Sequence, residues 1–101
     1  MGLHVMETVT FKLKPDVDRS NFEAAARAVN AFVRDRDGFV ARRLSCSSDG
    51  LWTEQIEWQS MAAAKGAAAA IGTAPGNAPF LEAIDMASVT VWRGEIALAV
   101  N

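Results

Sequence analysis

The feature that most constrains this chain is a strand-like segment that runs directly into a capped helix. Residues 51–58 alternate with the period of two of a β-strand, which places four side chains on one face: Trp52, Glu54, Ile56 and Trp58. Ser60 follows, and its hydroxyl can accept a hydrogen bond from the first turn of a helix over residues 61–71. That helix is rich in alanine, so it can lie close to a sheet and leave space beneath it.

The first part of the chain is predicted to be a strand followed by an amphipathic helix. Residues 3–13 alternate, and Glu7 is the charged residue on their apolar face. Ser20 and Glu23 form a predicted capping box, after which apolar side chains recur at helical spacing. Gly38 is the predicted C-terminal cap, because glycine readily adopts the left-handed conformation that ends many helices.

The remaining segments supply two further strands and a short helix. A strand over residues 39–47 is predicted to join the strand at residues 51–58 through a hairpin turn at residues 48–50. A short helix over residues 79–84 precedes a last strand that begins near residue 87. Gly94 is expected to mark a bulge in this strand, whose apolar face continues to the C-terminus.

The order strand, helix, strand, strand, helix, strand predicts an α+β domain over residues 1–101 with the ferredoxin-like βαββαβ plan. In that plan a four-stranded antiparallel sheet carries both helices on one face. The face expected to lie under the helices bears Val9, Phe11, Ile56 and Trp58. The opposite face mixes apolar and β-branched residues such as Met6, Thr8 and Thr53, so we expect a partner to cover it, most simply a second copy.

Composition excludes several classes of partner and site. The net charge of −2 argues against a nucleic-acid partner, which requires a clustered basic face. No apolar run approaches the roughly 20 residues of a membrane span, and the N-terminus lacks a signal-peptide pattern, so we expect a cytoplasmic protein with no membrane partner. Cys46 is the single cysteine and no Cys/His grouping has metal-ligand spacing, so no disulfide, metal or other cofactor is predicted.

Three short stretches resemble a known superfamily: ETVTFKLKP at residues 7–15, DGF at residues 37–39 and IEWQSMAAA at residues 56–64. With the element order, they resemble the dimeric α+β barrel superfamily, which holds antibiotic biosynthesis monooxygenases, stress-responsive A/B barrel proteins and haem-degrading monooxygenases. The resemblance implies a homodimer whose open sheet faces close into a shared barrel. It also implies, in each subunit, a pocket for a small hydrophobic or aromatic ligand between the sheet and the helices.

The chain departs from these relatives at positions that carry their chemistry. The stress-responsive proteins begin with a histidine where this chain has Glu7, and a related polyketide cyclase has a tyrosine and a histidine where this chain has Ala67 and Asn77. Haem-degrading members use a tryptophan at the position of Trp58, but the histidine that holds their iron has no counterpart here. Neither the cyclase acid-base pair nor haem binding is therefore expected.

Glu7 and Glu54 are the predicted catalytic residues. They lie on the helix-facing sides of neighbouring strands and can approach one another in an apolar pocket, where burial and a nearby like charge both raise a carboxyl pKa and favour a general base. The cofactor-independent monooxygenases of the superfamily need such a base and a dry, aromatic-lined pocket. The predicted lining residues are Phe11, Phe22, Trp52, Trp58 and Asn77.

Two functions remain open from the sequence. One is a monooxygenase-like enzyme that oxidises a small aromatic or polyketide-like compound, and it predicts a water-poor cavity under the second helix. The alternative is a non-catalytic dimeric module that binds a small hydrophobic ligand or has a structural or stress role. It predicts a filled core in which the glutamates pair with Arg43, Arg93 or Arg27, or a ligand released unchanged. Asn77 can equally serve only to cap the short helix.

Overall fold

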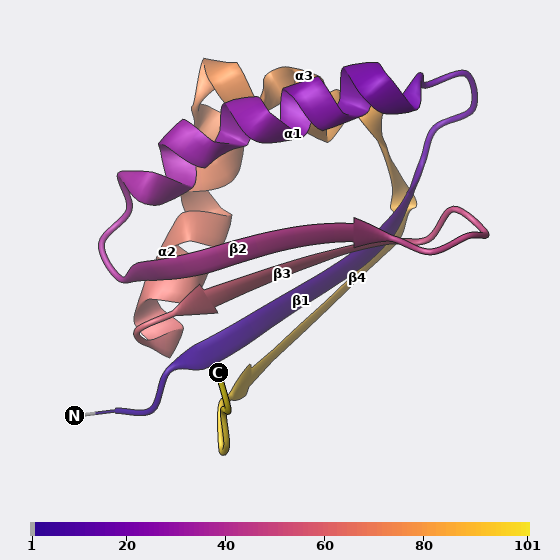
Figure 1. Ribbon diagram of the computed structural model, residues 1–101. Helices are drawn as coiled ribbons and strands as arrows, with labels where there is room; N and C mark the ends of the chain where they lie inside the picture. The colour runs from indigo at the N-terminus through magenta and orange to yellow at the C-terminus, as the bar shows by residue number, and fades with distance from the viewer. Residues whose placement is uncertain (1) are drawn as a thin grey trace.

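The computed structural model describes residues 2–101, and Met1, the first residue of the predicted domain, lies outside them. The elements follow in this order (Figure 1): β1 (Val5–Leu13), α1 (Arg19–Arg34), β2 (Phe39–Cys46), β3 (Trp52–Trp58), α2 (Met61–Ala70), the 3-10 turns η1 (Ile71–Thr73) and η2 (Pro75–Asn77), α3 (Ala78–Ala83) and β4 (Ile84–Glu95). None of the helices in residues 2–101 is long and apolar enough to cross a membrane.

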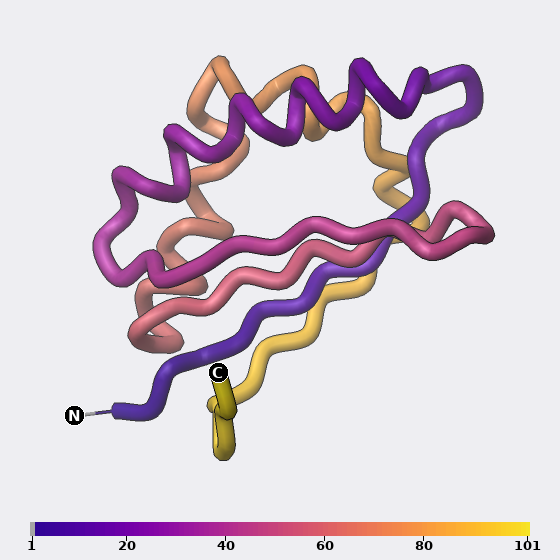
Figure 2. The backbone as a smooth tube through the Cα atoms, viewed as in Figure 1, coloured from indigo at the N-terminus to yellow at the C-terminus, as the bar shows by residue number. Residues whose placement is uncertain are grey.

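The strands of residues 2–101 pair as one antiparallel sheet in the order β2-β3-β1-β4. The helices all lie on one face of this sheet, and α1 runs along it (Figures 1 and 2). This arrangement confirms the predicted ferredoxin-like α+β fold. In the pairing of β1 with β3, Glu7 lies opposite Ile56 and Val9 lies opposite Glu54, so both glutamates face the helices.

The core lies between the sheet and the helical layer. Phe11, Ile56 and Trp58 are buried there, as the alternation predicts. An aromatic cluster joins the layers, since Phe22 of α1 stacks on Phe80 of α3 with ring centroids 5.3 Å apart and meets Trp52 edge-on at 4.9 Å. Aromatic pairs of this geometry contribute about 0.5–1.5 kcal/mol beyond the area that they bury.

The start of α1 differs from the prediction. The helix begins at Arg19, and its N-cap is Asp18, whose Oδ2 accepts a hydrogen bond from the backbone N of Asn21 at 3.0 Å. The predicted capping box at Ser20 and Glu23 is therefore wrong. A carboxylate at the N-cap also interacts favourably with the positive end of the helix dipole, so Asp18 is a better cap than Ser20.

The end of α1 also differs. Asp35 is the C-cap, so the prediction of Gly38 as the cap is wrong. Gly38 nevertheless has a positive φ of +86°, and a Cβ at this position would lie 2.7 Å from the Cβ of Ala63 in α2. The loop before β2 therefore requires glycine both for its left-handed backbone and for its close approach to α2.

The last strand departs most from the prediction. β4 begins at Ile84, directly after α3, and ends at Glu95 opposite Val5, where β1 begins. One further hydrogen bond follows, from the backbone N of Ile96 to the carbonyl oxygen of His4 at 2.8 Å, and residues 97–101 form no strand. The prediction of a bulge at Gly94 is wrong. Gly94 pairs with Met6 in register, and a Cβ there would lie 2.5 Å from Cη2 of Trp92, so the glycine makes room for the indole ring.

An irregularity does occur elsewhere in this pairing. The register of β1 with β4 shifts between Thr10 and Lys12, which leaves residues 86–89 of β4 outside the regular ladder. Ser88 covers part of the gap, because its Oγ accepts a hydrogen bond from the backbone N of Lys12 at 2.8 Å. Bulges of this kind redirect side chains at the edge of a sheet.

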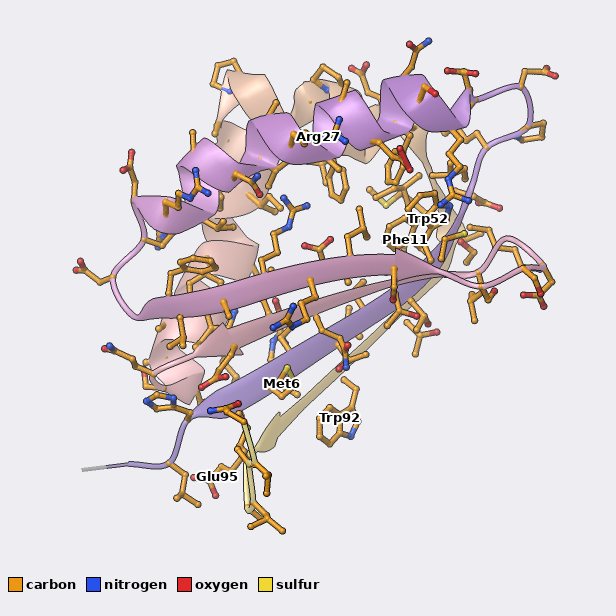
Figure 3. The ribbon with its side chains drawn as sticks, viewed as in Figure 1. Met6, Phe11, Arg27, Trp52, Trp92 and Glu95 are labelled. Carbon is orange, nitrogen blue, oxygen red and sulfur yellow. The ribbon has the colours of Figure 1, made fainter. Side chains whose placement is uncertain are left out.

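The face of the sheet opposite the helices is uncovered within this chain. Met6 of β1 and Trp92 of β4 point away from the helical layer (Figure 3), and Trp92 is 58% exposed. The covering partner expected for this face stays a prediction.

Candidate functional site

An apolar cavity of about 180 Å³ lies between the sheet and the helices, beside β4. The sheet and every helix contribute to its wall, as these side chains illustrate: Val9, Phe11, Val29, Ala68, Phe80 and Leu81. The irregular part of β4 forms another section, through Met86 and Val89. Within the described part of the chain, the charged side chains that line this cavity are Glu7, Glu54 and Arg93.

Glu7 forms an ion pair across the β1–β4 ladder. It lies opposite Arg93, whose Nε donates to Oε2 of Glu7 at 2.6 Å. The Glu7 side chain is 9% exposed and the Arg93 side chain 26% exposed. The pair therefore joins a buried carboxylate to a guanidinium that keeps contact with solvent.

Glu54 is held by Arg42 of the neighbouring edge strand β2. Nε of Arg42 donates to Oε1 of Glu54, and Nη2 donates to Oε2 at 3.2 Å. Nη1 of Arg42 donates to the carbonyl oxygen of Ala26 at 2.6 Å and to Oδ1 of Asn30 at 2.8 Å, which ties the pair to α1. The side chains of Arg42 and Glu54 are each 8% exposed, so this is a buried, bidentate ion pair.

Glu54 binds a proton more readily than an ordinary glutamate. Burial raises the pKa of Glu54 above its ordinary value, and the hydrogen bonds and charge of Arg42 offset this only in part. The like charge of Glu7 raises the pKa of Glu54 further. Glu54 is thus a carboxylate whose proton affinity is increased inside a largely apolar cavity, which is what a general base requires.

The two glutamates meet the same cavity from neighbouring strands. They are diagonal across the β1–β3 ladder, because Glu7 lies opposite Ile56 and Glu54 opposite Val9. Such diagonal neighbours are about 7–8 Å apart at Cα. Both carboxylates are ion-paired, which the hypothesis of a non-catalytic module predicts. They also border a cavity and not a filled core, which the hypothesis of an enzyme predicts.

The partners of the glutamates were predicted in part. Arg93 pairs with Glu7 as one of the expected arginines, whereas Arg43 and Arg27 pair with neither glutamate. Arg42 was missed. The register of β2 with β3 shifts between Phe39 and Ala41, so alternation counted from Phe39 would turn Arg43 toward the helices in place of Arg42. The signal for Arg42 lies farther along the strand, where Leu44 and Cys46 share its face.

Of the predicted lining residues, Phe11 lines this cavity and the other four lie outside it. Phe22 and Trp52 belong to the aromatic cluster, and Figure 3 shows Trp52 near Phe11 between the sheet and α1. Trp58 packs edge-on against Phe39 with ring centroids 5.9 Å apart. Asn77 is 1% exposed, and its Nδ2 donates to the carbonyl oxygen of Ile71 at 2.9 Å, so it braces the turns between α2 and α3.

Sequence reasoning did not find most of the cavity wall. Ile71 comes from a 3-10 turn and Met86 from the irregular part of β4, where no periodic pattern indicates which way a side chain points. Leu81 comes from α3, which has only six residues and is too short to show a helical period. No group of three or more His, Cys, Asp or Glu side chains in residues 2–101 is arranged to hold a metal ion.

Comparison with known proteins identifies the fold. No protein-family model matches the sequence, and no curated protein matches it. Solved structures do match. The cofactor-independent oxygenase SnoaB from Streptomyces nogalater has a TM-score of 0.68 and 20% identity, with 99% of this chain and 97% of that chain covered.

Two further structures give the same result. A monooxygenase from the gene ActVA-Orf6 of Streptomyces coelicolor, in complex with nanaomycin D, has a TM-score of 0.69 and 15% identity, with 98% of this chain and 92% of that chain covered. A protein from Bordetella bronchiseptica, provisionally described as an antibiotic biosynthesis monooxygenase, has a TM-score of 0.79 and 13% identity, with 95% and 99% covered. Over nearly its full length, this chain therefore has the ferredoxin-like fold of the antibiotic biosynthesis monooxygenase structures.

Proposed function

We propose that this protein is a cofactor-independent monooxygenase that oxidises a small phenolic aromatic compound. The observation that carries the proposal is the apolar cavity, whose charged lining residues in the described chain are Glu7, Glu54 and Arg93. An apolar wall favours an aromatic body, and the carboxylates offer a base at its edge. The similarity to a cofactor-independent oxygenase supports the same chemistry.

Glu54 is the proposed base. Burial raises the pKa of this carboxyl group, which strengthens it as a proton acceptor, and the bidentate contact with Arg42 fixes its orientation. The carboxylate takes the phenolic proton, and the resulting phenolate passes electrons to dioxygen. For 1-naphthol the balanced sum is C10H8O + O2 → C10H6O2 + H2O, with 1,4-naphthoquinone as the product.

The volume of the cavity limits the substrate. A cavity of about 150 Å³ is known to hold one benzene ring, so a cavity of about 180 Å³ suits a compound of one or two rings. A larger polyketide would have to extend past Met86 and Val91, which are 57% and 48% exposed at the edge of the wall.

The proposed active form is a homodimer of one domain per chain, residues 1–101. The uncovered sheet face, with Trp92 at 58% exposure, provides the contact surface. Dimeric barrels are typical of the proteins with this fold, and closure of the two sheets would bury this face.

Oxygen uptake with 1-naphthol tests the proposal. The wild-type protein is expected to consume dioxygen and form 1,4-naphthoquinone, and Glu54→Gln is expected to lower kcat by about 10²-fold or more, the usual contribution of a general base. Glu95→Gln, an exposed glutamate on β4, serves as the control and is expected to keep full activity. Glu7→Gln identifies which carboxylate acts, because loss of turnover in this variant alone would assign the base to Glu7.

The non-catalytic module stays the alternative, and one observation favours it: each glutamate already has an arginine partner. In that case 1-naphthol would bind and be recovered unchanged, without oxygen uptake above the autoxidation rate. That result would overturn the monooxygenase proposal and leave a ligand-binding role for the cavity.

A further inference from the structure

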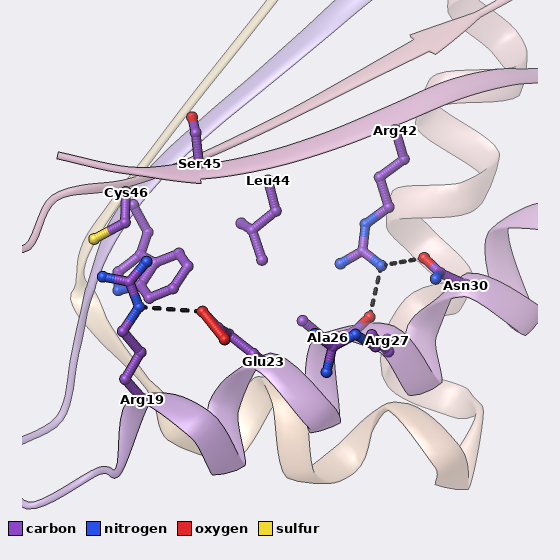
Figure 4. A pocket seen from close by; sticks show the side chains of 10 residues that line it. Arg19, Glu23, Ala26, Arg27, Asn30, Arg42, Leu44, Ser45 and Cys46 are labelled. Atoms are coloured by element: carbon purple, nitrogen blue, oxygen red, sulfur yellow. Dashed lines mark hydrogen bonds and ion pairs between the residues drawn. The ribbon is translucent and has the colours of Figure 1, made fainter.

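We infer that a groove between α1 and β2 is a second binding site, for a small monoanion with a flat apolar body such as an aromatic carboxylate. The groove has a volume of about 330 Å³, within the range of roughly 300–1,000 Å³ typical of ligand pockets. Among residues 2–101 it shares no lining residue with the cavity that holds Glu7 and Glu54. It lies on the helix side of the sheet, so a partner on the opposite face would leave it open (Figure 4).

The groove carries a surplus of positive charge. Three arginines line it, and two of them have carboxylate partners: Arg19 pairs with Glu23 at 3.1 Å, and Arg42 pairs with Glu54. Arg27 has no carboxylate within ion-pair distance in the described part of the chain. One uncompensated cation favours a ligand with one negative charge, and Glu23 would repel a second.

Arg42 provides a buried donor to this groove. A guanidinium group has five N–H donors. Two of those of Arg42 bind Glu54, and one each binds Ala26 and Asn30, which leaves one N–H of Nη2 free. Because the Arg42 side chain is 8% exposed, a ligand oxygen that accepts this N–H does so away from bulk water, where the hydrogen bond is stronger.

An apolar patch lies between the cationic groups, beside the polar side chains of Glu23 and Ser45 (Figure 4). Figure 4 shows Arg19 toward one end of the groove and Arg42 toward the other, with Leu44 between them. Trp52 forms part of the wall, and the Arg19 guanidinium lies 5.1 Å from the centre of its ring. A planar guanidinium over an aromatic ring can extend the stack to a flat ligand, which accounts for the choice of an aromatic body.

Titration of the isotope-labelled full chain with 2-naphthoate, followed by two-dimensional amide NMR, tests this inference. We expect shifts at the backbone amides of residues 23–30 and 44–46 and at the indole N–H of Trp52. The neutral 2-naphthamide should bind about tenfold more weakly, because it lacks the charge that strengthens hydrogen bonds to guanidinium. The same spectra show directly whether each variant is folded.

Arg27→Gln is the test variant, and Arg34→Gln is its matched control. Both arginines are exposed on α1, two turns apart, and Arg34 does not line the groove. Arg27→Gln should raise the Kd for 2-naphthoate about threefold, as loss of one exposed ion pair predicts, while Arg34→Gln should leave it unchanged. Any one of four results would overturn the inference. These are equal affinities for naphthoate and naphthamide, equal effects of the two variants on the Kd, amide shifts at Phe80 and Val89 in place of the expected residues, and no binding.

Discussion

Replacement of Arg42 by methionine tests the electrostatic account of the buried pair most directly. Arg42→Met removes both hydrogen bonds to Glu54 and those to Ala26 and Asn30, and it leaves a carboxylate with a side chain 8% exposed and no cation against it. Breaking a buried pair by removal of one partner costs about 3–5 kcal/mol. Since a domain of this size is stable by roughly 5–15 kcal/mol, we expect a clear fall in the free energy of unfolding at pH 7.5.

The penalty should depend on pH, and its sign follows from the pKa of Glu54. That pKa is already raised above 4.5, and loss of Arg42, which lowers it, would raise it further. Below 4.5 the carboxyl group is protonated in both the folded and the unfolded chain, so the charge contribution to the penalty is absent. As the pH rises from 4.5 through the folded pKa, the unfolded chain loses this proton more readily than the folded chain, so stability falls, and the loss is complete above the folded pKa.

Urea unfolding followed by circular dichroism, at one protein concentration and at pH 4.5 and 7.5, measures this penalty. Arg34→Met, on the exposed face of α1, is the control and should change stability by less than about 0.5 kcal/mol. Arg42→Met combined with Glu54→Leu should be more stable than Arg42→Met alone, because no charge is left buried. A penalty for Arg42→Met below about 1 kcal/mol at pH 7.5, or an equal penalty at both pH values, would refute the reasoning.

Three other predictions concern single positions. NMR of the carboxyl carbon of Glu54 should give a pKa above 4.5. The contribution of this carboxyl group to stability should decline as the pH rises from 4.5 through that pKa. A pKa below 4.5 would contradict the balance of burial and pairing. Gly38→Ala should lower stability by about 1–3 kcal/mol because of its left-handed backbone and its contact with α2. Gly72→Ala should change stability little, because an added Cβ there has no atom within 4 Å. Similar losses of stability for Gly38→Ala and Gly72→Ala would refute this account. Light scattering should give twice the 10.8 kDa chain mass for the wild type and the single mass for Trp92→Asp, whereas a wild-type monomer would exclude the proposed dimer.

Periodicity was enough to identify the fold. The alternation in β1 and β3 correctly places Phe11, Ile56 and Trp58 under the helices, because a strand with one buried face must alternate in register with the core. The caps were harder to predict, since Asp18 and Ser20 are both good N-cap residues and only packing of the helix decides where it begins. The end of β4 depended on a partner, because a strand continues only where another strand offers hydrogen bonds, and β1 begins at Val5.

The sequence by itself determined that Glu7 and Glu54 share the helix-facing side of neighbouring strands, because that follows from a period of two and the order of the elements. Only the tertiary structure decided what surrounds them. Arg42 reaches Glu54 from the edge strand, Arg93 reaches Glu7 from the opposite edge strand, and the displaced residues 86–89 of β4 help to leave a cavity beside both. These contacts join residues far apart in the chain, and their geometry depends on strand register and on a local irregularity that no short-range pattern encodes.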